Sequence, residues 1–277
     1  MLSYKHGYHA GNHADVLKHI CLIQAYKSLK RHHNSISYID THAGNGHYSF
    51  KSEYMSKNKE YENGISKLEN YKYDNQAIKY YLKVLRNINN STKLSFYPGS
   101  PLIMSYLTDN SDRLLFYEMH TNEFHILKKN LSKKINSKIF NTDGFKFTSN
   151  KINKGQKTLV LVDPSYEIKD DFDKVVDTLR ELDRNYSNIT AIIWYPVLNI
   201  EKNDLFIDSI RRIGSNRITR IELPIKKYNE DIGMKGSGII LFEGTNFLIN
   251  NMKECVKDLY QIFKYENCNI KPKIQKI

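Results

Sequence analysis

Short runs of hydrophobic residues alternate along this chain with longer segments whose hydrophobic positions recur every three to four residues. The short runs are typical of buried β-strands, and the longer segments are typical of helices with one buried face. Strands are predicted at 35–40, 114–118, 158–163 and 191–196, with later ones at 217–223 and 238–242. Helices are predicted from residue 13 to about 30, at 121–134 and at 171–186. This alternation predicts an α/β fold around a mainly parallel sheet.

One interval is too long for a single strand–helix–strand unit. Asp40 and Glu118 end two successive predicted core strands but lie far apart in the sequence, whereas such a unit needs only about 30 to 40 residues. Residues 51–95 carry hydrophobic residues at helical spacing. We therefore expect 51–95 to be an inserted helical subdomain, and residues 1–50 and 96–277 to form the main domain.

Two helix starts are indicated by their capping residues. Asn12 precedes the first helical segment, and asparagine is a favoured N-cap. Ser100 follows Pro98-Gly99 and precedes Pro101, and proline is favoured at the first helical position. We expect Asn12 and Ser100 to be the caps of these two helices.

The composition is that of a folded globular protein, with 40% hydrophobic and 26% charged residues in a chain of 277. The longest apolar runs, 159–162 and 239–242, are far shorter than the roughly 18 residues that cross a membrane. No apolar segment of a signal peptide follows the first residues. Cys21, Cys255 and Cys268 lack the spacing of a zinc or redox motif. These features predict a cytoplasmic protein with reduced cysteines and no membrane partner.

The formal net charge of +12 favours a polyanionic partner such as nucleic acid. The charge is uneven along the chain. Residues 123–157 carry nine lysines against two acids, whereas residues 163–208 carry eleven acids against five bases. A merely solvated lysine-rich surface is the alternative that charge alone leaves open.

A glycine-containing loop, Thr41-His42-Ala43-Gly44-Asn45-Gly46, follows the first predicted strand. Glycines at the carboxyl end of a strand let the backbone approach a nucleotide, although the third glycine of the dinucleotide fingerprint is missing. Glu118, at the end of another predicted strand, has a carboxylate suited to the two hydroxyls of a ribose. An ordinary strand-to-helix turn and a solvated strand end are the alternatives.

The tetrapeptide Asp163-Pro164-Ser165-Tyr166 ends the predicted strand 158–163. An exocyclic adenine amine is a poor nucleophile because its lone pair is delocalised into the ring. The Asp163 carboxylate and the Pro164 carbonyl can each accept one of its hydrogens, and Tyr166 can stack on the base. The tetrapeptide thus suits methylation of an amine, with a simple proline turn as the alternative.

Two further segments carry candidate functional groups. Asp143-Gly144 follows a third predicted strand, where the acid could recognise an adenine amino group; a simple turn is equally compatible. The first 13 residues are rich in tyrosine and histidine, which can stack on bases or contact phosphates. Zinc binding by these histidines is disfavoured because no cysteine set or His-Glu-x-x-His pattern accompanies them, so no metal is expected.

Taken together, these motifs resemble one family: the bacterial large-subunit ribosomal RNA adenine-N6 methyltransferase J family. The resemblance runs from Met1 to about Phe242 and is carried by the motifs in the same order: the opening through His19, Thr41-His42-Ala43-Gly44, Tyr97-Pro98-Gly99-Ser100-Pro101, Asp143-Gly144, Asp163-Pro164-Ser165-Tyr166 and Trp194-Tyr195-Pro196. It implies a Rossmann-like, class I S-adenosylmethionine-dependent methyltransferase acting on N6 of one adenosine of 23S rRNA, adenine 2030.

The resemblance also implies roles for individual residues. Catalytic roles fall to Asp163, Pro164 and Tyr166. Cofactor contacts fall to His19, His42, Ser100, Glu118, Asp143, Gly144 and Asp163. Substrate contacts fall to Tyr4, His6 and Lys18, with a phosphate contact expected for Lys18.

Ser165 departs from the family pattern, which has a second proline at this position. Since Pro164 retains the carbonyl that would accept the amine hydrogen, activity is expected to survive this change.

The expected substrate is protein-free or partly assembled 23S rRNA, and the expected state is a monomer. Two other functions remain open: a DNA adenine-N6 methyltransferase and a noncatalytic RNA-binding protein.

Overall fold

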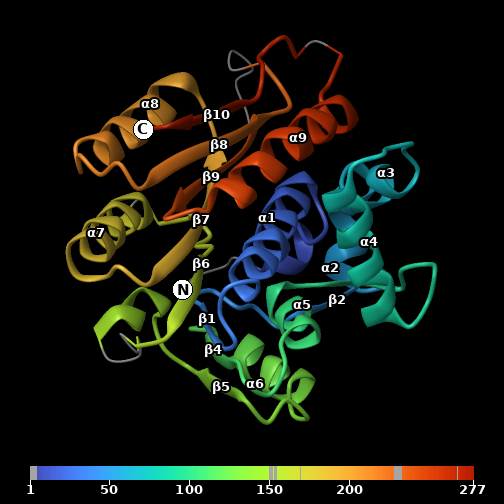
Figure 1. The fold of residues 1–277 in the computed structure, drawn as a ribbon. Helices are drawn as coiled ribbons and strands as arrows, with labels where there is room; N and C mark the ends of the chain where they lie inside the picture. The colour runs from blue at the N-terminus through green and yellow to red at the C-terminus, as the bar shows by residue number, and fades with distance from the viewer. Residues whose placement is uncertain (1–4, 150–151, 153–154, 169, 228–232, 267) are drawn as a thin grey trace.

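A central eight-stranded sheet with helices on both faces forms the body of the protein in the computed structural model (Figure 1). The structure describes residues 5–149, 152, 155–168, 170–227, 233–266 and 268–277. The strands of the main sheet are β1 (Ile36–Asp40), β4 (Arg113–Tyr117), β5 (Ser137–Phe140), β6 (Lys157–Val162), β7 (Ile189–Val197), β8 (Ile218–Pro224), β9 (Gly236–Phe242) and β10 (Lys273–Lys276). Their order across the sheet is β10-β8-β9-β7-β6-β1-β4-β5.

The five strands from β5 to β7 are parallel, and β9, β8 and β10 add to them in antiparallel pairs. β1 pairs with β4 on one side and β6 on the other, so the chain changes direction across the sheet at β1. In open α/β sheets a ligand binds outside the carboxyl ends of the strands at such a point. The Rossmann-like α/β prediction is confirmed.

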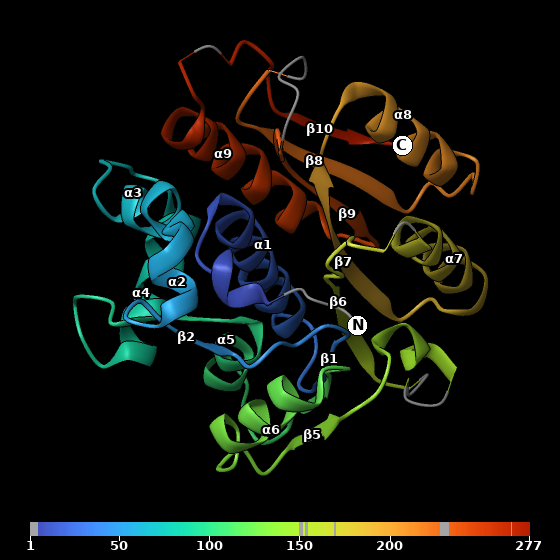
Figure 2. The same cartoon turned by 180° about the vertical axis from the view of Figure 1, so that it is seen from behind.

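Two hydrophobic clusters flank the sheet. The longer helices are α1 (His13–Lys30), α4 (Gln76–Asn89), α5 (Ser100–Leu107), α6 (Thr121–Asn130), α7 (Asp170–Asn185), α8 (Ile200–Arg211) and α9 (Asn246–Phe263). Helices α1 and α9 pack on one face, and α7 and α8 pack on the other (Figures 1 and 2). Successive residues of β1 divide between the clusters, Tyr38 in the first and Ile39 in the second, as a pleated strand requires.

Helix α1 differs from the expected one-sided helix because it is buried on nearly all sides. It lies between α9 and α4 in both views of the ribbon (Figures 1 and 2). Its polar residues Asp15, Lys18 and His19 are therefore buried too. Asn12 caps α1 as predicted, its side chain accepting hydrogen bonds from the amides of Ala14 and Asp15.

Helical elements fill most of the interval that the sequence marked as an insertion: α2 (Glu53–Asn58), a 3-10 turn (Glu60–Asn63), α3 (Ile65–Glu69) and α4. Two short antiparallel strands that the pattern did not predict, β2 (His47–Ser49) and β3 (Phe96–Pro98), bracket them. Residues of α4 belong to the same hydrophobic cluster as α1. The division into domains at residues 50 and 96 stays a prediction.

The expected role of Ser100 as a helix cap is wrong. Gly99 occupies the cap position of α5, and Ser100 is the first helical residue. The Ser100 hydroxyl instead donates to the Asp40 carboxylate, with 2.7 Å between Oγ and Oδ2. A buried carboxylate needs hydrogen-bond donors, and the Ser100 hydroxyl supplies one to Asp40.

No helix in the described ranges is long and apolar enough to cross a membrane.

The insertion joins the start of α1 through a close backbone approach at Gly64. The Ile65 amide donates to Gly11 O at 2.8 Å, and a Cβ added to Gly64 would lie 2.0 Å from that same oxygen. We expect Gly64→Ala to lower the free energy of unfolding by about 1 to 3 kcal/mol, the usual cost of overpacking. Urea denaturation measures it, with the exposed neighbour Asn63→Ala as control. Equal stability of the two variants would show that the approach is not tight.

Candidate active site

A pocket opens at the carboxyl ends of β1, β4 and β6, and nearly all the predicted site residues line it. They come from separate parts of the chain: His6, Lys18, His19, His42, Ser100, Glu118, Asp143, Gly144 and Asp163. Ser165 also lines the pocket, whereas Pro164 and Tyr166 do not. Tyr4 lies outside the described residues.

Tyr166 is held against the end of β7. Its hydroxyl donates to the backbone oxygen of Trp194 at 2.5 Å, and its ring packs on Phe172 with 4.5 Å between ring centroids. Its φ angle of 55° lies in the left-handed region, which is uncommon for a residue other than glycine. These contacts fix the turn after Asp163. Stacking of Tyr166 on a base stays a prediction.

The Glu118 carboxylate faces the glycine loop. Its two oxygens accept from the amides of Gly44, at 2.8 Å, and His120, at 2.7 Å. Burial raises the pKa of Glu118, while the two amide hydrogen bonds act in the opposite direction. Each carboxylate oxygen can accept more than one hydrogen bond, so the side chain can still accept from a ligand.

Gly144 lies against the backbone of the glycine loop. A Cβ at this position would lie 1.7 Å from Thr41 O, so only glycine fits. Beside it, Phe145 N donates to Asp143 Oδ1 at 3.0 Å, which orients that carboxylate in its turn. The loop after β5 is thereby drawn in against the loop after β1, and both line one pocket.

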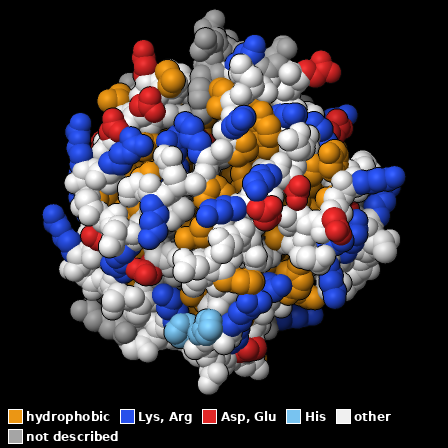
Figure 3. Space-filling model, turned by 45° about the horizontal axis from the view of Figure 1, so that its top comes forward, with side chains coloured by type: hydrophobic (Ala, Val, Ile, Leu, Met, Phe, Trp, Pro, Cys, Tyr) orange, Lys and Arg blue, Asp and Glu red, His pale blue; other side chains and the backbone are white. Residues whose placement is uncertain are grey.

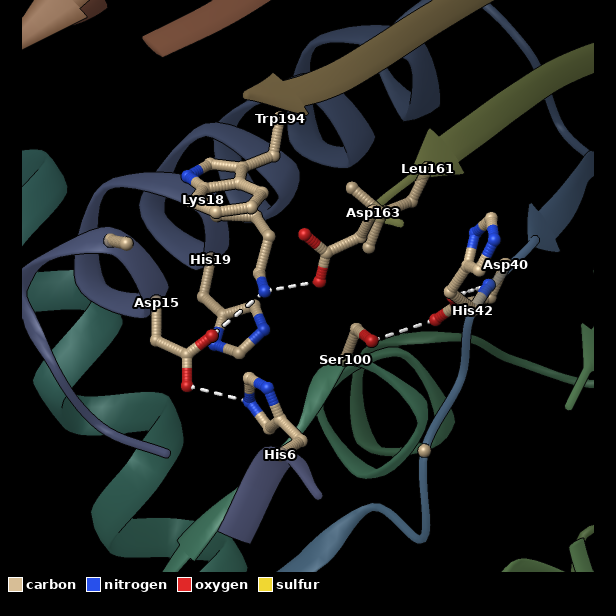
Figure 4. Close-up of polar contacts among 12 residues, drawn as sticks. His6, Asp15, Lys18, His19, Asp40, His42, Ser100, Leu161, Asp163 and Trp194 are labelled. Atoms are coloured by element: carbon tan, nitrogen blue, oxygen red, sulfur yellow. Dashed lines mark hydrogen bonds and ion pairs between the residues drawn. The ribbon is translucent and has the colours of Figure 1, made fainter. Parts of the chain in front are cut away.

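A chain of charges runs from the N-terminal segment to the end of β6 (Figure 4). The Lys18 ammonium forms ion pairs with Asp163 and, at 2.8 Å, with Asp15 Oδ1. Asp15 Oδ2 lies 3.0 Å from His6 Nε2 and accepts from the Gly11 amide at 2.9 Å. The two carboxylates raise the pKa of Lys18 against the effect of burial, and the nearby cations hold the pKa of Asp15 well below its usual range. Lys18 is therefore a buried cation in direct contact with Asp163, the candidate catalytic residue.

Asp15 and Asp40 do not line the pocket but bind two residues that do, Lys18 and Ser100, and sequence reasoning did not select them as site residues. Asp15 could have been suspected because it lies three residues before Lys18, on the same helix face. Asp40 is fully buried and accepts from the hydroxyls of Tyr38 and Ser100. Burial raises its pKa to about 6. Within the described residues, no cluster of three or more His, Cys, Asp or Glu side chains could hold a metal ion.

His42 is a half-buried residue of the glycine loop. Its Nδ1 lies 2.7 Å from Thr41 Oγ1, and its ring meets Phe145 edge-on at 5.0 Å. Burial lowers the pKa of His42 from 6.5 to about 4. The imidazole is therefore neutral at neutral pH, with one N–H donor and one acceptor nitrogen.

The lowered pKa of His42 predicts acid sensitivity. As pH falls from 6.5 towards 4, the unfolded chain takes up a proton that the folded state excludes, so stability falls by up to about 1.4 kcal/mol per pH unit. We expect His42→Gln to flatten the dependence of unfolding free energy on pH between 7 and 5, measured by urea denaturation. Asp40 acts in the opposite sense but equally in both proteins. The exposed His32→Gln variant is the control, and a slope unchanged by His42→Gln would contradict the argument.

Comparison with known proteins places the chain in a family. A family model described as "Ribosomal RNA large subunit methyltransferase D, RlmJ" matches residues 33–269. The ribosomal RNA large subunit methyltransferase J of Haemophilus influenzae is 36% identical over 256 residues, covering 92% of this chain and 91% of that protein. The Escherichia coli protein of the same name is 34% identical over 242 residues, covering 87% and 86%.

A solved structure agrees with this result. The protein LPL1258 from Legionella pneumophila superposes with a TM-score of 0.86 at 28% identity, covering 97% of this chain and 98% of that one. The chain belongs to the ribosomal RNA large subunit methyltransferase J family.

Proposed function

We propose that this protein transfers a methyl group from S-adenosylmethionine to the exocyclic N6 of a specific adenosine in 23S rRNA, at the position corresponding to adenine 2030. The observation that carries the proposal is the placement of Asp163-Pro164-Ser165-Tyr166 at the end of β6, with Asp163 in the same pocket as Glu118 and the glycine loop. The names of the relatives support large-subunit ribosomal RNA as the substrate. Methyl transfer to an amine needs a group that lies next to the cofactor and accepts the hydrogens of the amine.

S-adenosylmethionine is the cofactor implied by this family and fold, and the pocket residues fit it. Glu118 offers carboxylate oxygens to ribose hydroxyls, and Asp143 offers an acceptor to an adenine amino group. Gly144 lets its loop pack directly on the Thr41 backbone, which brings the two loops together at the pocket wall. His19, His42 and Ser100 line the same pocket. When bound, the cofactor supplies an electrophilic methyl group on a sulfonium sulfur.

Asp163 is the residue we assign to the amine. Its Oδ2 is paired with Lys18, which leaves Oδ1 to accept a hydrogen from N6, while the Pro164 carbonyl accepts the second. These two acceptors localise the nitrogen lone pair and stabilise positive charge developing on N6. Methylation makes the amine acidic, and Asp163 can then take its proton.

Lys18 acts on the substrate through Asp163 in this proposal, and not through a phosphate. It is 4% exposed and already lies between two carboxylates, so an RNA phosphate would have to displace one of them. The ammonium pairs with Asp163 Oδ2 and so fixes which oxygen is left for the amine. His6 is tied to the same group through Asp15.

The RNA itself must present the adenosine unpaired or flipped from its stack to reach this pocket. His6, in the short helical turn His6–Tyr8, lines the pocket and can contact the substrate. Figure 3 shows Lys and Arg side chains spread over one face of the molecule, with Asp and Glu among them. The proposal includes protein-free or partly assembled 23S rRNA as substrate, action as a monomer and a cytoplasmic location.

Binding of the cofactor tests the pocket assignment. We expect Glu118→Ala to weaken S-adenosylmethionine binding by roughly 1.5 to 3 kcal/mol, the value of hydrogen bonds to a charged group. Isothermal calorimetry measures it, and the exposed acid Glu254→Ala on α9 is the control. If Glu118→Ala binds like the wild type, Glu118 does not belong to the site.

The assignment of Asp163 is tested by single-turnover methylation. We expect Asp163→Asn to slow transfer by about 100-fold or more in the folded variant at saturating cofactor, because an amide cannot hold the developing charge as a carboxylate does, and to lower stability because Lys18 loses one of its two carboxylates. Asp177→Asn, on the solvent side of α7, is the matched control. A folded Asp163→Asn protein with the wild-type rate would refute the amine-acceptor role.

The whole function is tested in cells. Mass-spectrometric mapping of 23S rRNA from cells lacking this protein should show one N6-methyladenosine lost, restored by the wild-type gene and not by Asp163→Asn. In vitro, RNA and DNA oligonucleotides of the same sequence separate an RNA enzyme from a DNA adenine methyltransferase. Failure to bind S-adenosylmethionine in the calorimeter would favour a noncatalytic RNA-binding protein.

A further inference from the structure

Three buried side chains connect the inserted helices to the wall of the pocket. His19 Nδ1 lies 2.7 Å from Tyr97 Oη, and Tyr97 Oη lies 3.0 Å from Tyr81 Oη. His19 is on α1, Tyr97 is on β3, and Tyr81 is on α4. Both tyrosines are 0% exposed and His19 is 1% exposed, so solvent does not reach the hydroxyls.

The directions of these hydrogen bonds follow from counting donors. Within the described part of the chain, Tyr97 Oη is the one hydrogen-bond partner found for Tyr81 Oη. A buried hydroxyl hydrogen needs an acceptor, so Tyr81 donates to Tyr97. The Tyr97 hydrogen must then be donated to His19 Nδ1. The opposite direction would leave the Tyr81 hydrogen buried without an acceptor, at the cost of a lost hydrogen bond.

The protonation of His19 is fixed by the same arrangement. Burial lowers its pKa to about 3, so the ring is neutral at working pH and carries one hydrogen. With Nδ1 accepting from Tyr97, that hydrogen is on Nε2. His19 lines the pocket, and Nε2 is the ring nitrogen left to meet a ligand.

We infer that Tyr81 and Tyr97 are positioning residues that hold His19 as the Nε2–H tautomer, which makes its imidazole a hydrogen-bond donor to the bound cofactor. The acceptor is the carboxylate of the methionyl part, the strongest acceptor that the cofactor offers to a donor. Because Tyr81 is on α4, the inserted helices complete the cofactor pocket chemically without lining it. The inference rests on the cofactor site proposed above and not on the base or the RNA.

Nuclear magnetic resonance reads the tautomer directly. The full-length protein is labelled with 15N-histidine, the His19 signals are assigned by their loss in His19→Gln, and long-range proton–nitrogen correlations identify the protonated ring nitrogen. We expect Nε2 to be protonated and Nδ1 to carry the signature of a hydrogen-bonded acceptor. Tyr97→Phe should shift the Nδ1 signal, whereas Tyr26→Phe, which removes a buried hydroxyl bonded to Asp112, should not. Protonation at Nδ1 in the wild type overturns the inference.

Calorimetry then tests the consequence with two ligands, in the absence of RNA. S-adenosylhomocysteine keeps the methionyl carboxylate, and 5′-methylthioadenosine lacks it. We expect Tyr97→Phe to weaken S-adenosylhomocysteine roughly fivefold, the value of about one hydrogen bond, and to leave 5′-methylthioadenosine unchanged. The Tyr81→Phe/Tyr97→Phe double variant, which leaves no orphaned hydroxyl, should behave the same way.

The affinities for the two ligands separate the possible roles of Tyr97. Equal weakening of both ligands means that Tyr97 only supports the pocket structurally, and unchanged affinity for both means that His19 does not donate to the carboxylate. Either result overturns the inference. Because no RNA is present, neither result bears on the adenine-N6 proposal, and loss of RNA methylation activity alone does not bear on the tautomer.

Discussion

The buried Lys18 ammonium is the interaction on which the site depends. Removing a cation from water costs several kcal/mol, which two carboxylates in direct contact with Lys18 offset here. Asp15 comes from the same helix, one turn earlier, and Asp163 comes from the end of β6. The ion pairs therefore fix helix α1 relative to the strand that carries the catalytic candidate. A side chain 145 positions away in the sequence is held in place by the first helix of the fold.

The buried ion pair of Lys18 and Asp15 also accounts for the contacts that the N-terminal segment and the inserted helices make with α1. Besides its ion pair with Lys18, Asp15 accepts a hydrogen bond from the Gly11 amide and contacts His6. Helix α1 carries these polar groups while being buried on nearly all sides, so something must cover the side that faces away from the sheet. Helix α4 covers that side and also contributes Tyr81, the far end of the hydrogen-bonded chain to His19.

The sequence could predict those features that depend on local pattern. The parallel strands and their terminal acids, such as Glu118 and Asp163, follow from short apolar runs that end in a polar residue. Partners distant in the sequence, such as Lys18 with Asp163, do not follow from any local pattern, because periodicity says which face is buried but not what it meets. For the same reason the cap prediction for Ser100 is wrong, since nothing nearby in sequence shows that the Asp40 carboxylate lies within reach. The short strands β2 and β3 were missed because three residues carry too little periodic signal.

Asp40, Glu118 and Asp163 all lie at or just after the end of a strand, but their different surroundings give them different roles. Asp40 is fully buried and accepts from the hydroxyls of Tyr38 and Ser100 and, at 3.4 Å, from the His42 amide; burial raises its pKa to about 6, and it links β1 to α5. Glu118 accepts from two backbone amides that fix its orientation while leaving acceptor capacity for hydroxyl groups. Asp163 forms an ion pair with the buried Lys18 ammonium through one carboxylate oxygen, and it lines the pocket. Of the three, only Asp163 combines direct contact with a buried cation and a second oxygen outside that ion pair, which is the arrangement we assign to the reacting amine.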